Sequence, residues 1–305
     1  MTGIAVAGEV RDAVGAGAPV VALESTIFTH GLPRPLDLEV AREAEKALRA
    51  DGVVPATVGV VDGVPTVGLT DAQIERLATD DAAVKVSIRD LPVAAAKRLG
   101  GGTTVAATSM LAHRAGVRVF ATGGLGGVHH GASTTFDESA DLVALAATPV
   151  VVVSAGVKSI LDIGATLERL ETLNIPVVGY RTTRYPGFYV ADSGHRLDHA
   201  VDGPDEAAAV ARARDELGLS SAVLVANPVP AVDELDPAEH GRLVAGAWDA
   251  AERAGIVGHD ITPFLLDHIQ RATGGRSLEV NVAVYRNNVA VAGDIARALA
   301  PSASA

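Results

Sequence analysis

The chain has 305 residues, of which 48% are hydrophobic, so it can bury a large core in one large domain or two smaller ones. Its net charge of −12 argues against nucleic acid or an anionic membrane as a partner, because both need concentrated lysine and arginine, and favours a small ligand. The absence of cysteine excludes disulfides, thiolate catalysis and a cysteine-type zinc site.

Short β-branched runs alternate along the chain with alanine-rich amphipathic segments. In chain order the predicted strands are 20–23, 57–61, 84–88, 117–121, 150–154, 176–180 and 222–226. The predicted helices are 38–50, 71–78, 104–115, 164–173, 205–217, 237–254, 262–271 and 278–299. This alternation predicts an α/β fold: a single layered α/β/α domain with a mostly parallel or mixed central sheet.

We expect one domain over residues 1–305, because no linker-like segment or charge block divides the sequence, with a frayed tail at 301–305. The N-terminal stretch lacks the basic region and the long apolar core of a signal peptide. No window is apolar and charge-free over the length that a membrane span needs. The sequence therefore predicts a cytoplasmic protein without a membrane partner.

Lys158 is the leading candidate for a nucleophile. It follows the apolar run 150–153 and a short exit segment at 154–157. Open α/β sheets bind ligands beyond the carboxyl ends of their strands. Partial loss of water in such a place favours a neutral amine, which is the form that attacks carbonyl carbons.

Glu24 and Lys85 are two further charged residues in strand contexts. Glu24 directly follows the predicted strand 20–23, where a carboxyl group is a candidate general acid or base; a helix or turn cap is the alternative. Lys85 lies inside a predicted strand, and an inward-pointing lysine there needs an anion as its partner. The alternative for Lys85 is a charged residue that protects the edge of a sheet.

Glycine-rich segments suggest two further ligand contacts. The tract 123–127 carries two of the three glycines of a dinucleotide-binding fingerprint, but His129 stands at the third position and no helix start follows. We therefore expect that this tract lets the backbone approach a ligand instead. A second run, 100–102, precedes Thr103, Thr104 and a predicted helix, whose start could bind phosphate or could simply be capped.

A metal site has only weak support from residue spacing. His129 and His130 are adjacent and would point in different directions in a strand or a helix, so they cannot form a two-histidine metal face. Asp137 and Asp141 are four residues apart and could share a helix face, either as cation ligands or as solvated surface. With carboxylates dominant and thiols absent, any metal should be a hard one, Mn²⁺ or Mg²⁺.

A series of unusual segments runs from residue 19 to residue 296. They are ALESTIFTHG, VKVSIRDL, GGTTVAAT, ATGGLGGVHHG, TFDESADL, AGVKSILDIG, VGY followed by PGFY, LVANPVP, and TPFLL ahead of SLEVNVAVYRNN. In content and order they resemble the signature blocks of pseudouridine-5′-phosphate glycosidases, also called indigoidine synthase A-like proteins. The length and rarity of several blocks make the resemblance specific at the level of the family.

The resemblance implies reversible cleavage of the C–C glycosidic bond of pseudouridine 5′-phosphate to uracil and ribose 5-phosphate. In similar enzymes a lysine attacks the anomeric carbon and opens the sugar as an imine, and Lys158 matches that lysine. A C-glycoside has no leaving-group oxygen to protonate, so the paired-carboxylate mechanism of O-glycosidases does not apply. The imine instead supplies the electron sink that breaking a C–C bond needs.

The resemblance implies roles for other residues as well. Glu24 matches the family's acid/base, and Asp137 matches the aspartate that holds one Mn²⁺ per subunit. Substrate-binding positions of the family match Lys85, Thr104, Val105, His129, Ser139, Ala140, Asp141 and Asn281. The family further implies a homo-oligomer, specifically a trimer.

The chain also departs from the family pattern, although Glu24, Asp137 and Lys158 survive. The departures are Arg34, Asp37, Ile88, His130, Arg184 and His259. Because they cluster around segments expected to face the ligand, they suggest that the protein binds a different aglycone or holds the phosphate differently.

Two other functions stay open at this point. Some family members resemble C-glycosynthases of C-nucleoside pathways, which join ribose 5-phosphate to a different nucleobase-like heterocycle through the same mechanism in reverse. A non-catalytic sugar-phosphate-binding protein would require a broken Glu24, Lys158 or Asp137, and none is broken. The sequence leaves the natural aglycone and the physiological direction open.

Overall fold

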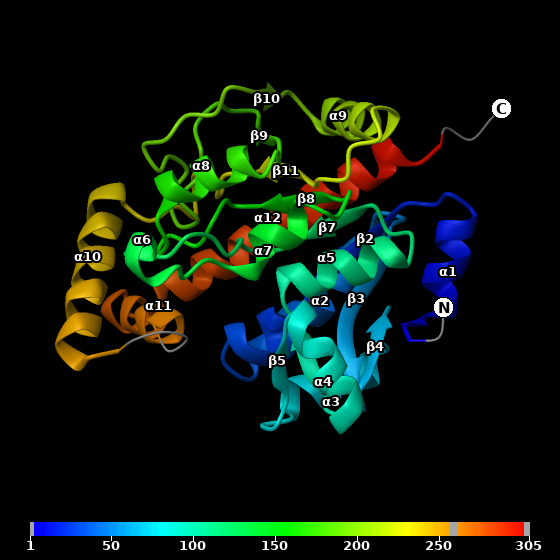
Figure 1. The fold of residues 1–305 in the computed structure, drawn as a ribbon, viewed down its shortest axis with the longest axis horizontal. Helices are drawn as coiled ribbons and strands as arrows, with labels where there is room; N and C mark the ends of the chain where they lie inside the picture. Colours follow the sequence, from blue (N-terminus) through cyan, green and yellow to red (C-terminus); the bar gives the residue numbers. More distant parts are fainter. Residues whose placement is uncertain (1–2, 257–260, 302–305) are drawn as a thin grey trace.

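The structure is a computed structural model that describes residues 3–256 and 261–301. A long sheet crosses the molecule, with helices on both of its faces (Figure 1). Its strands are β1 (Ala5–Val6), β2 (Val20–Leu23), β3 (Val54–Val61), β4 (Val64–Val67), β5 (Val84–Val86), β6 (Gly101–Thr103), β7 (Val119–Ala121), β8 (Val151–Ser154), β9 (Val177–Tyr180), β10 (Ala200–Val201) and β11 (Val223–Ala226).

The centre of the sheet is parallel. In space the strands follow the order β1-β4-β3-β2-β7-β8-β11-β9-β10, with β6 beside β3 and β5 beside β6. The pairs from β3 through β2, β7, β8 and β11 to β9 are all parallel, whereas β4 and β6 are antiparallel to β3. The predicted mixed, mostly parallel sheet is therefore confirmed.

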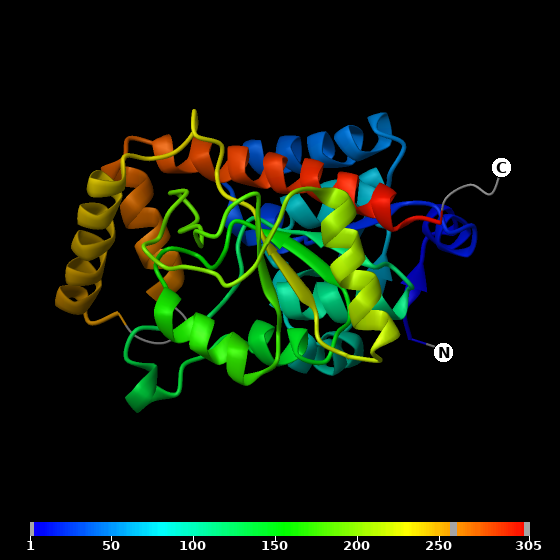
Figure 2. The ribbon, with the colours of Figure 1, turned by 90° about the horizontal axis from the view of Figure 1, so that it is seen from above.

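Helices cover the two faces of this sheet. They are α1 (Gly8–Gly15), α2 (Leu36–Ala50), α3 (Asp71–Thr79), α4 (Leu91–Lys97), α5 (Val105–Arg114), α6 (Ala132–Thr135), α7 (Ala140–Leu145), α8 (Ile163–Thr172), α9 (Pro204–Glu216), α10 (Pro237–Ala254), α11 (Ile261–Ala272) and α12 (Arg276–Leu299), with short turns η1 (Ile27–Gly31) and η2 (Ile88–Asp90). Figure 2 shows α2 and α12 side by side along one face. Among the described residues, no helix combines the length and hydrophobicity that a membrane span needs.

Alternation along each central strand sends side chains into two cores. In β7, Val119 and Ala121 join the core beneath α2, α9 and α12, while Phe120 joins the core beneath α1, α5 and α7. All three side chains are almost fully buried. Because successive side chains of a strand point to opposite faces of the sheet, one continuous apolar run supplies both cores.

Every predicted strand and helix is present, with ends shifted by a few residues. The strand predicted at 84–88 stops at Val86, because Asp90 accepts a hydrogen bond from the Ser87 N–H at 2.9 Å and turns the chain into η2. The expected frayed tail lies outside the described residues except for Pro301. The single-domain organisation stays a prediction.

Replacing Phe120 with alanine should lower the free energy of unfolding by about 3–5 kcal/mol, because it empties a fully buried site in a central strand. Urea denaturation followed by circular dichroism measures this change. Val143→Ala is the control, since Val143 on α7 is 60% exposed. A loss below about 1 kcal/mol for Phe120→Ala would show that the core around β7 is not packed as described.

Candidate active site

Three neighbouring parallel strands bring the predicted catalytic residues to one edge of the sheet. β2 pairs with β7, and β7 pairs with β8, so their carboxyl ends meet at that edge. Glu24 directly follows β2, Thr122 directly follows β7, and Lys158 follows β8 after a short loop. This is the edge at which open α/β sheets bind ligands.

Two threonine hydroxyls hold the carboxylate of Glu24. Thr122 donates through Oγ1 to Oε1, and Thr26 donates through Oγ1 to Oε2 at 2.5 Å. Glu24 is 8% exposed and Thr122 is fully buried. A hydroxyl can donate to a carboxylate or accept from a carboxylic acid. The same two partners can therefore serve Glu24 with and without its proton.

A buried hydroxyl network anchors the backbone beside Glu24. Ser25 donates through Oγ to the carbonyl of Val58 in β3 at 2.6 Å and accepts from the N–H of Thr103 in β6 at 2.8 Å. The hydroxyl of Thr103 donates to the same carbonyl at 2.8 Å. The carboxyl end of β2 is thereby tied to two other strands, which gives the carboxylate a rigid support.

The loop that carries Lys158 is bonded to the loop that follows β7. The N–H of Leu125 donates to the carbonyl of Gly156 at 2.9 Å, and the N–H of Lys158 donates to the carbonyl of Leu125 at 3.1 Å. Gly156 has a φ of +79°, and a Cβ there would lie 2.6 Å from the carbonyl oxygen of Pro186, so only glycine fits. These contacts fix the backbone from which the half-buried Lys158 projects.

Lys85 lies close to Lys158. Burial lowers the pKa of Lys85 below its ordinary value, the charge of Lys158 lowers it further, and the carboxylates of Glu24 and Asp141 raise it. Lys85 is nevertheless exposed, and among the described strands β5 pairs only with β6, so the alternative of a charged residue at the edge of a sheet also fits. Glu24 is already bonded to hydroxyls, and Asp141 to backbone N–H groups. An anionic ligand would therefore be the natural partner for this pair of amines.

The start of α5 binds a carboxylate of the protein itself. Asp141 accepts from the N–H of Ala106 through Oδ1 and from the N–H of Gly126 through Oδ2, both at 2.9 Å. Thr104 caps the helix with its hydroxyl, and Val105 is the first residue of α5. Asp141 thus occupies the helix start at which the sequence left phosphate binding open.

The expectation that Asp137 and Asp141 share a helix face is wrong. α7 begins at Ala140 with Ser139 as its cap, so Asp137 lies in the preceding loop. The hydroxyl of Ser139 accepts from the N–H of Asp141 at 3.2 Å. The segment 139–141 therefore aims Asp141 at α5 and leaves Asp137 beside His129.

The glycine tract packs mainly against protein. A Cβ would collide with Phe188 at Gly124, with Ser139 at Gly126 and with Thr166 at Gly127. On the Cβ side these three glycines therefore make room for side chains of the protein, and a close approach of a ligand to the tract stays a prediction. At Gly123 the nearest atom to such a Cβ would be Oδ1 of Asn281, 3.6 Å away, so Asn281 on α12 faces the start of the tract.

Asp137 and His129 form the candidate metal position. The carbonyl of Asp137 accepts from the N–H of His129 at 3.0 Å, and its Oδ2 lies 3.8 Å from Nδ1 of His129. Burial lowers the pKa of His129, while the charge of Asp137 opposes that shift. Nδ1 is buried and finds no hydrogen-bond partner in the described chain. No three potential ligands gather among the described residues, so a cation here would bind one carboxylate and mostly water.

His130 points to a different environment from His129, as predicted from their adjacency. Its Nδ1 lies 4.0 Å from Oδ2 of Asp162, and its ring meets Trp248 of α10 edge-on, with centroids 5.1 Å apart. The segment after the glycine tract is therefore in contact with α10.

Other departures from the family pattern have partners within the protein. Arg34 and Arg184 form ion pairs with nearby aspartates. Asp37 is buried in the first turn of α2. Arg34 and Arg184 thus have partners within the protein, and the expected change in how the aglycone or the phosphate is bound stays a prediction. Ile88 lies in η2, and His259 lies outside the described residues.

Sequence reasoning missed Thr26, Thr122 and Asn288. The two threonines sit next to Glu24 and next to the glycine tract, where their hydroxyls were a visible signal. Asn288 lies on the buried face of α12 and is fully buried. A buried amide requires hydrogen-bond partners, so its presence in that helix was also a signal.

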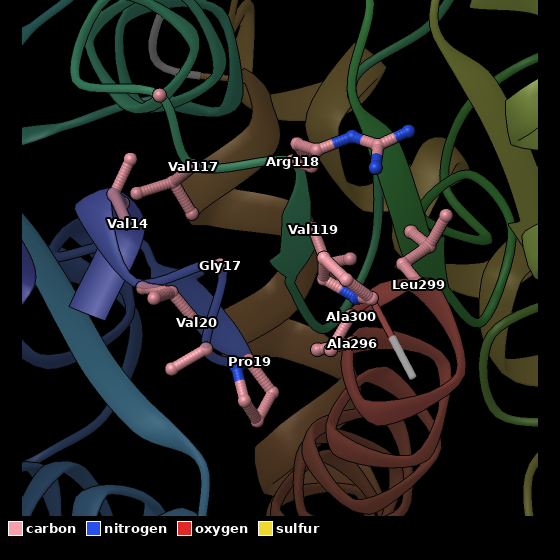
Figure 3. A pocket seen from close by; sticks show the side chains of 13 residues that line it. Val14, Gly17, Pro19, Val20, Val117, Arg118, Val119, Ala296, Leu299 and Ala300 are labelled. Carbon is pink, nitrogen blue, oxygen red and sulfur yellow. The ribbon is translucent and has the colours of Figure 1, made fainter. Parts of the chain in front are cut away.

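A separate pocket of about 180 Å³ lies at the opposite edge of the sheet (Figure 3). It is lined by the starts of β2 and β7, by α1 and by the end of α12. Its charged lining residue, Arg118, pairs with Asp215 of α9. Because it adjoins the amino ends of the strands, this pocket is remote from Glu24 and Lys158 and is not the candidate active site.

Known proteins match nearly the whole chain. A family model described as "Indigoidine synthase A like protein" matches residues 9–298. A pseudouridine-5′-phosphate glycosidase of Saccharopolyspora erythraea is 72% identical over 292 residues, which cover 96% of this chain and 96% of that protein. Another, from Frankia alni, is 60% identical over 297 residues, covering 97% of this chain and 82% of that protein.

Solved structures share the fold. The prealnumycin C-glycosynthase AlnA in complex with ribulose 5-phosphate has a TM-score of 0.92 at 38% identity, covering 98% of each chain. An indigoidine synthase A-like protein from Thermotoga maritima has a TM-score of 0.86 at 37% identity, covering 96% of this chain and 95% of that one. The predicted α/β fold is thus confirmed, and this chain belongs to the indigoidine synthase A-like family.

Proposed function

We infer that this chain is a C-glycosidase that reversibly cleaves pseudouridine 5′-phosphate into uracil and ribose 5-phosphate. Its relatives with that activity in their name reach 72% identity over almost the full length. The structural observation that carries the inference is the meeting of Glu24 and Lys158 at the carboxyl ends of neighbouring parallel strands, with Lys85 on β5 near enough for their charges to act on it. An amine nucleophile, a carboxyl group for proton transfer and a second amine for an anion are the groups this reaction needs.

In the proposed mechanism, Nζ of Lys158 bonds to the anomeric carbon, and the bond from that carbon to the ring oxygen breaks as the oxygen takes a proton. Glu24 then gives a proton to C5 of the base. The nitrogen lone pair forms a C=N double bond as the C–C bond breaks, and the bonding electrons return to the base. Water hydrolyses the imine and releases ribose 5-phosphate and free Lys158.

Substrate contacts follow from the same geometry. Lys85 supplies positive charge for the anionic sugar phosphate, because both neighbouring carboxylates are bonded elsewhere. Asn281 faces Gly123, the residue after Thr122, and this position supports its assignment to the base. From the family resemblance we assign sugar-phosphate contacts to Thr104, Val105, His129 and the segment 139–141, in which the carboxylate of Asp141 supports the start of α5 and does not itself bind the phosphate.

Asp137 would hold Mn²⁺, with water as the main co-ligand. A single carboxylate, beside an imidazole nitrogen that has no hydrogen-bond partner in the part of the chain the structure describes, fits a hard cation that keeps most of its water. When bound, the cation would offset negative charge of the sugar phosphate. The cytoplasmic location and the trimer stay predictions.

A C-glycosynthase is the second candidate, favoured by the match to AlnA along the whole chain. The chemistry is identical in reverse, so the two activities differ in the heterocycle that the site accepts. Identity of 72% to the glycosidase, against 38% to AlnA, supports the glycosidase. Intact Glu24 and Lys158 at one edge disfavour a non-catalytic sugar-phosphate-binding protein.

Lys158 should form a covalent adduct with ribose 5-phosphate. Borohydride reduces an imine to a stable amine, so treatment in the presence of the sugar should add mass at that residue, as read by peptide mass spectrometry. Lys158→Ala should lose both the adduct and turnover, while Lys97→Ala, at an exposed lysine of α4, should keep both. An active Lys158→Ala enzyme would refute the nucleophile assignment.

Activity should depend on a divalent cation bound by Asp137. Chelation should lower both pseudouridine 5′-phosphate cleavage and its synthesis from uracil, and Mn²⁺ should restore them. Asp137→Asn should weaken Mn²⁺ binding measured by electron paramagnetic resonance, whereas Asp205→Asn, on the exposed surface of α9, should not. Full activity of metal-free enzyme would remove this assignment.

Glu24→Gln should keep the shape of the side chain but lose the proton that the base carbon needs. We expect turnover to fall roughly 10²–10⁴-fold, the usual range for general acid/base catalysis. Trapping of the sugar on Lys158 should persist. Loss of trapping together with turnover would move Glu24 to ring opening, and near-normal turnover would exclude it from proton transfer.

A further inference from the structure

Asn288 lies at the centre of a buried amide network behind Glu24. Its Nδ2 donates to the carbonyls of Thr122 at 2.8 Å and Gly123 at 3.2 Å, and its Oδ1 accepts from Nδ2 of Asn227 at 2.9 Å. Asn288 and Thr122 are fully buried, and Asn227 is 3% exposed. Because carbonyl oxygens only accept, the amino group of Asn288 must face them, so the network has a single orientation.

The network continues into the carboxylate. The N–H of Thr122 donates to the carbonyl of Val153 in β8 at 3.0 Å, and its own carbonyl accepts from Asn288. Its backbone is thus held from both sides, by β8 and by α12. The hydroxyl that donates to Glu24 projects from this fixed backbone, so the placement of the carboxylate depends on both contacts.

The bond to the Thr122 carbonyl is the specific contribution of Asn288. The carbonyl of Gly123 also accepts from the N–H of Ala155 at 3.0 Å, so it does not depend on α12. Thr122 lies just beyond the last residue of β7, where the strand ladder ends. The side chain of Asn288 on α12 therefore gives the Thr122 carbonyl the hydrogen bond that a neighbouring strand would supply within the sheet.

We propose that Asn288 is a positioning residue for the acid/base Glu24, acting through Thr122. The inference rests on the acid/base role proposed above for Glu24. Asn281, at the base-binding position, lies seven residues earlier on α12, about two helical turns away. Both asparagines face the Thr122–Gly123 turn, so α12 aligns the base with the group that protonates it.

Asn288→Ala should lower kcat roughly 10²-fold, the effect of a displacement of about 1 Å in a catalytic group. KM should stay within about twofold, and borohydride trapping on Lys158 should persist, because neither depends on the proton that Glu24 gives to the base carbon. Asn287→Ala is the matched control: its Nδ2 makes the same kind of bond, to the carbonyl of Pro228 at 3.2 Å, but does not reach Thr122. That variant should keep kcat.

A double-mutant cycle tests the route through Thr122. Thr122→Val removes the hydroxyl and keeps the shape of the side chain, while Thr122→Ser keeps the hydroxyl and should retain most of kcat. If Asn288 acts through Thr122, adding Asn288→Ala to Thr122→Val should cause little further loss. If the two substitutions instead lower kcat by factors that multiply in the double variant, the proposed route through Thr122 is overturned.

Two further variants keep the outcome decisive. Asn227→Ala removes the donor that anchors Oδ1 of Asn288 and should lower kcat with unchanged KM, so it carries the test if Asn288→Ala does not fold. The positioning role alone would be overturned if Glu24→Gln is inactive while the folded Asn288→Ala variant keeps wild-type kcat. If Asn288→Ala does not fold, wild-type kcat in Asn227→Ala decides the question in the same way. Wild-type kcat in Glu24→Gln would instead overturn the acid/base role on which it rests.

Discussion

The carboxylate of Glu24, held between the hydroxyls of Thr26 and Thr122, is the constraint on which the rest of the site depends. A nearly buried carboxylate is costly unless both oxygens find partners. Hydroxyl partners meet this requirement and can reverse their role when the proton moves, which N–H donors cannot do. The parallel pairing of β2 with β7 places the two sides of this clamp on adjacent strands.

The same principle explains the other charged groups of the site. Asp141 is buried because two backbone N–H groups satisfy it, and it joins α5 to the loop after β7. Lys85 and Lys158 act on each other's charge, and within residues 3–256 and 261–301 neither forms an ion pair with a carboxylate, which favours an anionic ligand between them. The carboxylates of the site are thus hydrogen-bonded within the protein, whereas its amines are available to a ligand. This arrangement suits a sugar phosphate that reacts with an amine.

The sequence predicts the parts of this structure that depend on local pattern. Buried β-branched runs identify the strands, and Lys158 and Glu24 are found because each follows such a run. β6 was missed because Gly101 and Gly102 have no strand preference and pair only through β3 and β5. The contacts of Asp141, the glycine tract and Arg34 join residues distant in sequence, so neither their packing nor their partners can be read from spacing.

Hydrogen–deuterium exchange at C5 of uracil tests the central claim most directly. In the proposed mechanism Glu24 removes the proton from C5 as the C–C bond forms in the reverse direction, and in cleavage it returns a proton from the same carboxyl group. In D₂O, uracil incubated with the enzyme and ribose 5-phosphate should therefore lose its H5 signal in the proton NMR spectrum, and should keep that signal without the sugar. Retention of H5 in the complete mixture, or the same exchange without ribose 5-phosphate, would contradict the account.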